Sequence, residues 1–295
     1  MLRKLSRAAA LGLSPVRALG DSYMARRHKW PHKVIFIAGM PKSGTTWLEH
    51  LLGELPAYRV RAVHDPCGCV INHDVCDAVF AGLPRNLYSV VKLHTRFTPE
   101  NLRVIDKFDL HTVVMYRDLR DQCVSRYYHV LNEAAHRHHQ YYVSSSQSEG
   151  ISHCIEVILQ EYVTWIRDWL PVIAARPDRF MEVRYETLRA DPRSVLAEAL
   201  AFYGIDAPVE MIDAMIDGVK KKTTFNLKKN LERGTGTARK GMIGDWRNHF
   251  TPEHVRRLKE GCGEFLIELG YERDSNWDVS RPGGDGGSSH QSKER

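Results

Sequence analysis

The chain has 295 residues, of which 43% are hydrophobic and 26% are charged, and its formal net charge at pH 7 is +6. This composition is that of a globular protein and excludes a largely disordered or fibrous chain. The small excess of positive charge suits an anionic ligand, but it falls short of the dense basic surface of a nucleic-acid-binding protein. We therefore expect one large α/β domain that does not bind nucleic acid.

The two ends of the chain differ in composition from its middle. Residues 1–30 are rich in arginine and lysine, with Asp21 as their only acid. We interpret them as a flexible basic arm, with a weak membrane-surface helix or a transit peptide as the alternatives. Residues 279–295 have too little apolar surface to offset the entropy of ordering, so we expect a disordered tail. The domain proper should then span residues 31–278.

The six cysteines are too sparse for a disulfide scaffold, and we find no secretory signal or run of about 18 apolar residues. We expect reduced thiols and a cytoplasmic protein without a transmembrane segment. Cys67, Cys69, His73 and Cys76 form one cluster, but its first spacing is shorter than zinc sites use. We predict a loop with buried thiols here and no metal, and any function of the cluster stays open.

Five short segments rich in β-branched or aromatic residues alternate with segments of helical period. The strand segments are 34–38, 58–63, 89–94, 111–116 and 179–185. The helical segments are 44–55, 119–140, 152–174, 192–203, 208–217 and 252–269. This alternation predicts a three-layer, P-loop-like α/β fold, with a mostly parallel sheet of about five strands between helices.

Polar residues stand where the predicted strands end. In a parallel sheet the ligand lies beyond the carboxyl ends of the strands. The residues that follow or end strands there are Lys42, His94, Arg117 and Tyr185. We expect them to share one site.

The segment GMPKSGTT, residues 39–46, joins the first strand to the first helix and is similar to a phosphate-binding P-loop. Gly39 and Gly44 keep the P-loop spacing, and the backbone N–H groups between them can converge on an anion at the helix N-terminus. However, Thr45 stands where the P-loop lysine belongs, and the lysine of this loop is Lys42. Since no strand-end ligand for Mg²⁺ is evident, the loop suits transfer of a weakly charged group, such as a sulfuryl group, better than ATP chemistry.

PKSGTTW, residues 41–47, resembles the 5′-phosphosulfate loop of the sulfotransferases that use 3′-phosphoadenosine 5′-phosphosulfate (PAPS). Further matches follow in the order of that family: KLH (92–94), VMYRDLRDQCVSRYYH (114–129), RYE (184–186), KTTF (222–225) and RKGMIGDWRNHFT (239–251). The resemblance covers about residues 33–275 and is closest to the soluble cytosolic branch. It implies a sulfotransferase with PAPS as donor and without a metal.

The resemblance also implies catalytic roles. An oxygen nucleophile must lose a proton as it attacks sulfur, and His94 would accept that proton. Lys42 would neutralise the charge that builds on the leaving oxygen. Lys92 lies two residues from His94, hence on the same face of an extended strand, and would point at the sulfuryl oxygens. The implied reaction is a direct in-line displacement.

A larger set of residues is implied to bind the donor. The loop N–H groups that would take the 5′-phosphate belong to Ser43, Gly44, Thr45 and Thr46. The groups that would take the 3′-phosphate are Arg117 and Ser125, with a second clamp of Arg239, Lys240 and Gly241. The adenine would contact Trp47, Tyr185, Thr223 and Phe225. We interpret Arg120 and Arg126 as solvated surface residues, and Trp246 as structural support.

Several questions stay open at this point. Met40 stands where the family usually has tyrosine, and residues 259–268 lack a short dimer motif of many animal members, so the oligomeric state is undetermined. The segments expected to line the acceptor, 64–88 and 133–152, match nothing that identifies it beyond a small molecule with a hydroxyl or amine. The alternatives are a P-loop kinase or NTPase, which would need Mg²⁺ ligands, and a non-catalytic adenosine-bisphosphate-binding module, against which His94 argues.

Overall fold

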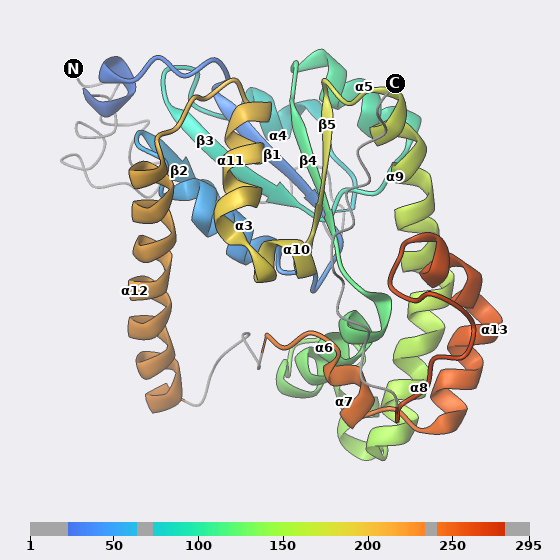
Figure 1. Cartoon of the computed structure of the whole chain (residues 1–295). Coiled ribbons are helices and arrows are strands. Elements are labelled where there is room, and N and C mark those ends of the chain that lie inside the picture. Colours follow the sequence, from blue (N-terminus) through green and yellow to red (C-terminus); the bar gives the residue numbers. More distant parts are fainter. Residues whose placement is uncertain (1–22, 64–72, 234–240, 281–295) are drawn as a thin grey trace. The chain divides into compact units, whose positions relative to one another are not determined.

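The computed structural model describes residues 23–63, 73–233 and 241–280, without the side chains of 222–233 (Figure 1). Residues 1–22 of the predicted basic arm, the tail from residue 281, and Cys67 and Cys69 lie outside these ranges. Contacts divide the chain into two compact units, Met1–Arg117 with Arg167–Gly236, and Asp118–Ile166 with Thr237–Arg295.

The first unit holds a five-stranded parallel sheet, which confirms the predicted fold class. In the order β2-β3-β1-β4-β5 the strands are β2 (Tyr58–Val60), β3 (Tyr88–Leu93), β1 (Val34–Gly39), β4 (Thr112–Tyr116) and β5 (Phe180–Arg184). Two boundaries differ from the prediction. The edge strand β2 is shorter than the segment 58–63, because its pairing with β3 ends at Val60 and Val90. Tyr185 does not end β5 but begins a helix.

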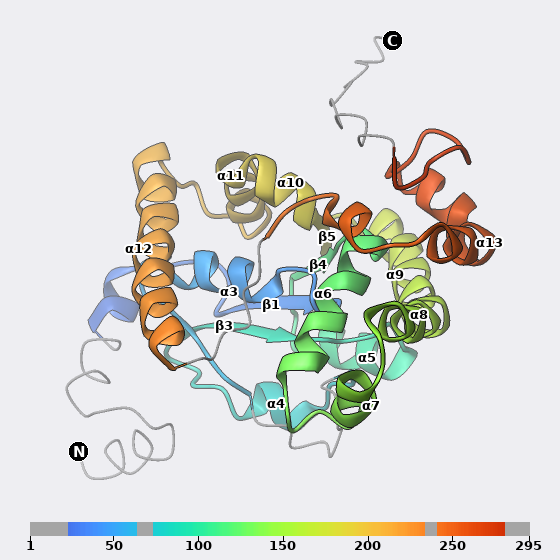
Figure 2. The same cartoon turned by 90° about the horizontal axis from the view of Figure 1, so that it is seen from below.

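Helices cover both faces of this sheet (Figures 1 and 2). One face carries α3 (Thr45–Gly53), α11 (Pro192–Phe202) and α12 (Val209–Arg233), whose buried residues share a hydrophobic core with inward residues of the strands. The opposite face carries α4 (Asp77–Ala81) and α5 (Pro99–Lys107). There Phe36 of β1 packs edge-on against Phe80 of α4. The short helix α10 (Tyr185–Ala190) follows β5.

The remaining helices refine the predicted helical segments. The predicted segment 119–140 consists of α6 (Leu119–Asn132) and the start of α7 (His139–Ser144), because Glu133 takes an extended conformation. The predicted segment 152–174 consists of α8 (Gln147–Val157), a π-helical turn (Ile158–Tyr162) and α9 (Val163–Ala175). The last helices are the 3₁₀ turn Asp245–Asn248 and α13 (Pro252–Glu268). Thr251 caps the start of α13, and its hydroxyl accepts the backbone N–H of His254.

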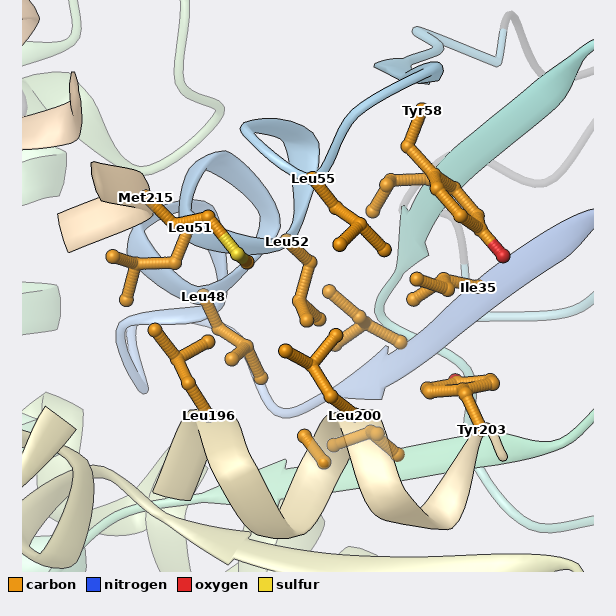
Figure 3. Close-up of a cluster of buried hydrophobic side chains, with 14 of the residues drawn as sticks. Ile35, Leu48, Leu51, Leu52, Leu55, Tyr58, Leu196, Leu200, Tyr203 and Met215 are labelled. Atoms are coloured by element: carbon orange, nitrogen blue, oxygen red, sulfur yellow. The ribbon is translucent and has the colours of Figure 1, made fainter. Parts of the chain in front are cut away.

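The core between α3 and the sheet is mostly aliphatic (Figure 3). Leu48, Leu51 and Leu52 of α3 are fully buried beside Leu196 and Leu200 of α11. This leucine-rich contact sets the distance between the helix and the strand edge, so it also positions the loop that precedes α3.

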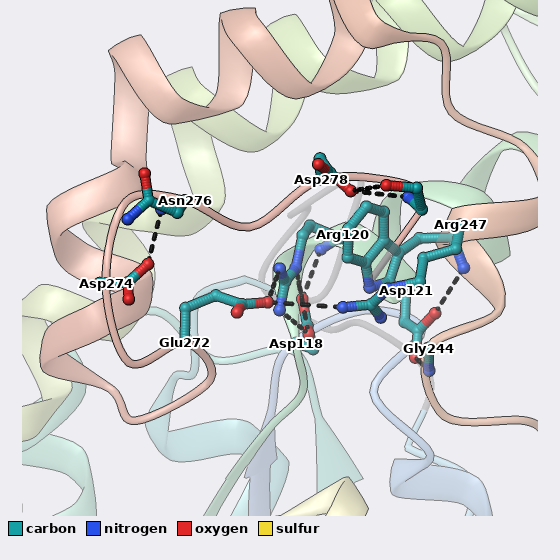
Figure 4. A network of polar contacts seen from close by, with 11 residues as sticks. Asp118, Arg120, Asp121, Gly244, Arg247, Glu272, Asp274, Asn276 and Asp278 are labelled. Atoms are coloured by element: carbon teal, nitrogen blue, oxygen red, sulfur yellow. Dashed lines mark hydrogen bonds and ion pairs between the residues drawn. The ribbon is translucent and has the colours of Figure 1, made fainter. Parts of the chain in front are cut away.

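The second unit is organised around a buried arginine (Figure 4). The side chain of Arg120 is 2% exposed, and its guanidinium pairs with Asp118 at 2.7 Å and with Glu272. It also stacks 4.4 Å from the ring centre of Trp246 and 4.7 Å from that of Trp277. The prediction that Arg120 is a solvated residue is therefore wrong. Two carboxylates and two indole faces, most of them distant in sequence, compensate for its desolvation.

The cysteines depart from the expectation of six reduced thiols. Cys123, Cys154 and Cys262 are free and buried, whereas Cys76 is disulfide-bonded. The expectation failed at Cys76 because a count over the whole chain says nothing about any one pair. None of the helices in the described part of the chain combines the length and the apolar character that crossing a bilayer requires.

We predict that Tyr203→Phe destabilises the first unit. Tyr203 is fully buried, and its hydroxyl lies 2.9 Å from the carbonyl oxygen of His111 and accepts the backbone N–H of Phe36 at 3.2 Å. Phenylalanine fills the same space but leaves these backbone groups unsatisfied, so the free energy of unfolding should fall by about 1–3 kcal/mol. Urea denaturation would measure the loss. Tyr23→Phe, at a 63% exposed position, is the control and should change stability by under about 0.5 kcal/mol.

Candidate functional site

The register of the sheet gathers polar residues at the carboxyl edge of the strands. Gly39 at the end of β1 pairs with Met115 of β4, and Met115 pairs with Val183 of β5. His94 follows β3 directly, Arg117 follows β4 and Tyr185 follows β5. Strand side chains alternate between faces, and Val90, Met115 and Val183 belong to the core under α3. His94, Arg117 and Tyr185, offset from them by even numbers of residues, therefore project toward the α3 side of the edge.

The loop from β1 to α3 is tightly built. The backbone N–H of Met40 donates to the carbonyl of Met115 at 2.9 Å, and the buried Ser43 hydroxyl donates to the carbonyl of Met40 at 2.6 Å. Gly39 and Gly44 both require the absence of a side chain. A Cβ at Gly39 would lie 1.9 Å from the Thr45 methyl carbon, and one at Gly44, whose φ is 84°, would lie 2.4 Å from the Tyr185 ring.

The first turn of α3 leaves backbone donors available. Its N-cap residue, Gly44, has no side chain that could accept their hydrogen bonds. The N–H groups of Trp47 and Leu48 both donate to the Gly44 carbonyl, at 2.8 and 3.2 Å. Thr45 and Thr46 precede them at positions where a helix provides no acceptor for its own N–H groups. These two donors, with the positive end of the helix dipole, form a site for an anion.

Three basic side chains belong to this edge of the sheet: Lys42 on the loop, Lys92 on β3, and His94 directly after β3. Nδ1 of His94 lies 2.8 Å from the Gly39 carbonyl oxygen, so the ring donates from Nδ1 and keeps Nε2 as an acceptor. Burial, with smaller contributions from the charges of Lys92, His73 and Lys42, lowers the pKa of His94 to about 4, although the Gly39 hydrogen bond opposes the shift. Burial and the neighbouring Lys92 lower the pKa of Lys42 to about 8. At neutral pH His94 is therefore uncharged, and Lys42 carries most of its charge.

Lys42 also has an unusual backbone. Its φ is 65°, in the left-handed region that residues with a Cβ seldom adopt. A glycine here would avoid this cost and the desolvation of a buried ammonium. The local fold therefore does not by itself explain a lysine at this position.

Arg117 extends the site along the strand edge. It is 7% exposed, and its guanidinium lies 4.2 Å above the ring of Tyr185, with Nε 3.8 Å from a carboxylate oxygen of Glu186. Trp47 meets the same tyrosine edge-on, at 6.3 Å between ring centres. Arg117, Tyr185 and Trp47 thus form one row beside Gly44. All three are among the ligand-binding residues predicted from the sequence.

Other predicted residues are not brought into this row by the described structure. Ser125 on α6 is half-buried, and Gly241 has a φ of 62°; both belong to the second unit. Arg239 and Lys240 lie outside the described residues. Thr223 and Phe225 lie on α12, where the side chains are outside the description. Their proposed contacts stay predictions.

Two buried polar residues near the site, Asn101 and Glu49, were not predicted from the sequence. Asn101 is 1% exposed, accepts the backbone N–H of Val75 at 2.9 Å and donates to the carbonyl of Arg96 at 2.8 Å. It thereby holds the segment that includes His73 against the chain after His94. The sequence feature that could have pointed to Asn101 is the start of α5, where Thr98 caps the helix ahead of Pro99. Glu49 is a buried carboxylate on α3 with a pKa that burial raises. Among the residues described, no group of three or more His, Cys, Asp or Glu is arranged to hold a metal ion.

Comparison with known proteins adds independent observations. A family model described as a sulfotransferase domain matches residues 32–270. Flavonol 3-sulfotransferase of Flaveria bidentis is 25% identical over 270 residues, which cover 80% of this chain and 82% of the relative. Cytosolic sulfotransferase 3 of Arabidopsis thaliana is 26% identical over 237 residues, which cover 74% of this chain and 72% of the relative.

Solved structures share the fold. The crystal structure of mouse sulfotransferase SULT7A1 complexed with PAP has a TM-score of 0.60 and 17% sequence identity, and the match covers 85% of this chain and 92% of that one. Retinol dehydratase in complex with androsterone and the inactive cofactor PAP has a TM-score of 0.58 and 18% identity, over 84% of each chain. At these identities the likeness shows the fold alone.

We predict an acid-side loss of stability that depends on His94. The pKa of His94 is 6.5 for an unperturbed ring and about 4 in the folded chain, so between these pH values the unfolded state binds a proton that the folded state does not. Stability from this group is thus complete above pH 6.5 and is lost as pH falls toward 4. At about 1.4 kcal/mol per pKa unit, the loss is on the order of 3 kcal/mol.

His94→Gln lacks the titrating group and should lose less stability than the wild type between about pH 7 and pH 4.5. Urea denaturation at both pH values would measure the loss of stability in each protein. Because the two proteins share all other histidines, the contribution of those histidines cancels when the two losses are compared. Parallel losses in the two proteins would contradict the assignment.

Proposed function

The chain belongs to the sulfotransferase domain family, whose members use PAPS as donor, and we propose that its strand-edge site moves the sulfuryl group to a hydroxyl or amine of a small-molecule acceptor. The observation that carries the proposal is the position of His94. A neutral imidazole, fixed by the Gly39 carbonyl, ends the strand next to an anion-binding loop and has a free acceptor nitrogen. A nucleotide kinase would have no comparable use for such a base beside its phosphate loop.

The residues of the first unit fit the donor. The N–H groups of Thr45 and Thr46 and the ammonium of Lys42 would hold the 5′-phosphate, and the glycine at 44 leaves the backbone open for close approach. Arg117, which lies over the ring of Tyr185, would provide a forked guanidinium for the 3′-phosphate, with Ser125 and the segment Arg239 to Gly241 as its proposed complement. Trp47 and Tyr185 offer aromatic faces for adenine. PAPS supplies an activated sulfuryl group when bound.

His94 acts as the general base in this proposal. Its Nε2 would accept the proton of the attacking hydroxyl, while Nδ1 keeps the ring oriented through Gly39. With a pKa of about 4, the imidazole of His94 is a weak base when no donor is bound. An anionic donor beside the ring would raise that pKa, because negative charge favours the imidazolium form. The proton affinity of His94 would thus increase when the site is loaded, which suits a base that must stay neutral until then.

The two lysines would act on charge. Lys42 lies on the loop beside the proposed 5′-phosphate position, so its ammonium would stabilise negative charge developing on the leaving oxygen. Lys92, two residues before His94 on the same face of β3, would face the oxygens of the transferred group. Because both lysines are half-buried, their ammonium groups would attract an anion more strongly than they would in bulk water.

The names of the relatives support a small acceptor. One relative is a flavonol sulfotransferase, and retinol dehydratase has been crystallised with androsterone, a small hydroxylated molecule. We therefore propose a hydroxylated or amine-bearing small molecule for this chain. The cytosolic names of several plant relatives likewise support a cytoplasmic location.

The proposal is tested by separating binding from transfer. His94→Gln should retain binding of adenosine 3′,5′-bisphosphate within about threefold, because His94 does not contact the phosphates in this scheme. Transfer to any acceptor found in a library screen with labelled PAPS should fall by at least about 100-fold, the usual contribution of general base catalysis.

His28→Gln, a half-buried histidine of the same unit, is the matched control and should leave both properties unchanged. If His94→Gln transfers the sulfuryl group as fast as the wild type, the assignment of His94 as the general base is wrong. Tighter binding of ATP with Mg²⁺ than of the bisphosphate would favour the kinase alternative.

We also predict that donor binding weakens above pH 8 through Lys42. The pKa of Lys42 is about 8 in the free protein, and a bound phosphate would raise it, so above pH 8 the free protein must regain a proton in order to bind. The Kd for adenosine 3′,5′-bisphosphate should then rise by up to about tenfold per pH unit. Lys42→Arg retains its charge at this pH and should flatten the dependence between about pH 7.5 and 9. Titration calorimetry would measure both, and an identical pH dependence in the two proteins would contradict the prediction.

A further inference from the structure

Glu49 is a buried carboxylate that the scheme above does not use. It is 7% exposed and lies on α3 four residues after Thr45, so the two share one face of the helix. The methyl group of Thr45 occupies the space beside Gly39 at the end of β1, which shows that this face is turned toward the sheet. The neighbouring Leu48 and Leu52 are fully buried in the core under the helix (Figure 3). The carboxylate is therefore enclosed between α3 and the strand edge.

Lys92 reaches the same layer from the sheet. It pairs in register with Ile37 of β1, and Ile37 belongs to the core that packs against α3. Val90, two residues before Lys92 on β3, also belongs to that core. Since side chains alternate along a strand, Lys92 projects toward α3 and not toward the opposite face. The Glu49 carboxylate and the Lys92 ammonium thus enter one narrow layer from opposite sides.

The charges in this layer are unbalanced without Glu49. Burial is the main cause that lowers the pKa of Lys42 and of His94; the Lys92 ammonium lowers both further, and the charge of His73 adds to the shift of His94. The described residues that shift these two pKa values include no carboxylate. Glu49 is acted on by burial, which raises its pKa, and by Lys92, which opposes that rise. Lys92 therefore acts on the negative charge of Glu49 as well as on the basic groups Lys42 and His94.

The position of Glu49 has a cost for anion binding. A carboxylate close to a phosphate loop repels a donor with several negative charges, and burying it requires compensation. Glutamine would fill the same space without either cost. Within the described residues, Glu49 and Lys92 attract each other without an ion pair closer than 4.0 Å, so this attraction can position the Lys92 ammonium without a direct salt bridge that an arriving anion would have to break.

We propose that Glu49 is a positioning residue, whose carboxylate draws the Lys92 ammonium to the strand edge and holds it between His94 and the phosphate loop, ready to meet the transferred sulfuryl group. This inference rests on the proposed function. Glu49 touches neither donor nor acceptor in it and acts through Lys92. Its charge would oppose donor binding slightly and favour transfer, which is the reverse of what a donor-binding residue does.

The effects of Glu49→Gln should therefore have opposite signs on binding and on transfer. The Kd for adenosine 3′,5′-bisphosphate should stay the same or improve by up to about fivefold, because a repulsive charge is removed. The kcat for transfer from PAPS should fall by about tenfold, because Lys92 is no longer held in place. Glu49→Asp, which keeps the charge, should recover part of that kcat. Glu100→Gln, an exposed glutamate on α5, is the matched control and should change neither value.

A double-mutant cycle identifies Lys92 as the route. In a Lys92→Met background, Glu49→Gln should change the rate constant of sulfuryl transfer, measured under single-turnover conditions, by less than about twofold. The inference is overturned if the tenfold loss appears equally in both backgrounds, or if Glu49→Gln leaves kcat within twofold of wild type. It is also overturned if Glu49→Gln weakens bisphosphate binding and lowers the melting temperature while Glu49→Asp recovers nothing, since that pattern belongs to a purely structural residue.

The failure of this inference is distinguishable from failure of the proposed function. An active wild type with additive mutant effects overturns the role of Glu49 alone. A wild type that binds adenosine 3′,5′-bisphosphate but transfers no sulfuryl group overturns the proposed function. In that case the same double-mutant cycle is measured on the Kd for adenosine 3′,5′-bisphosphate. Glu49→Gln should change this Kd only when Lys92 is present. Additive effects of the two mutations on the Kd would overturn the inference. A chain that does not bind the bisphosphate overturns both.

Discussion

The hydrogen bond between His94 Nδ1 and the carbonyl of Gly39 is the contact on which the site depends. It joins the end of β3 to the end of β1 at the residue where the anion-binding loop begins. The bond orients the ring and selects the tautomer that leaves Nε2 as an acceptor. Gly39 can serve this purpose only because it has no side chain, since Thr45 of the first helical turn fills the space where a Cβ would lie. One backbone carbonyl thus links the proposed base, the loop and the start of α3.

The protein treats buried charge in two different ways. Arg120 is enclosed by Asp118, Glu272 and two indole rings, so its charge is compensated within the second unit, and removal of one partner would leave a buried charge unpaired. Lys42 and His94 are half-buried beside other basic groups, and their pKa values are lowered as a result. Such an arrangement costs stability in the empty protein. It is relieved when negative charge arrives, and this explains why a site of this kind favours an anionic ligand.

Most of the fold and part of the site followed from local sequence patterns. Buried parallel strands are short runs of β-branched residues, and the loop glycines have fixed spacing, so the sheet and the residues Lys42, Lys92 and His94 could be placed from the sequence. The predictions failed where a contact joins distant segments. Arg120 looked like a surface residue because Glu272 and Trp277, which help to bury it, lie far along the chain. Glu49 looked like any polar residue of an amphipathic helix until the sheet packed against it.

By itself, the sequence determined the parallel α/β architecture, the place of the P-loop-like segment with its lysine at position 42, and the resemblance to sulfotransferases that the family match confirmed. These features are encoded within a few residues of one another, where backbone geometry and side-chain period decide the outcome. Only the tertiary structure decided that His94 is neutral and hydrogen-bonded to Gly39, that Arg117 lies over the ring of Tyr185, and that Glu49 faces the layer of Lys92. Burial and the distances between charges set these properties, and both arise only when segments from different parts of the chain are packed together.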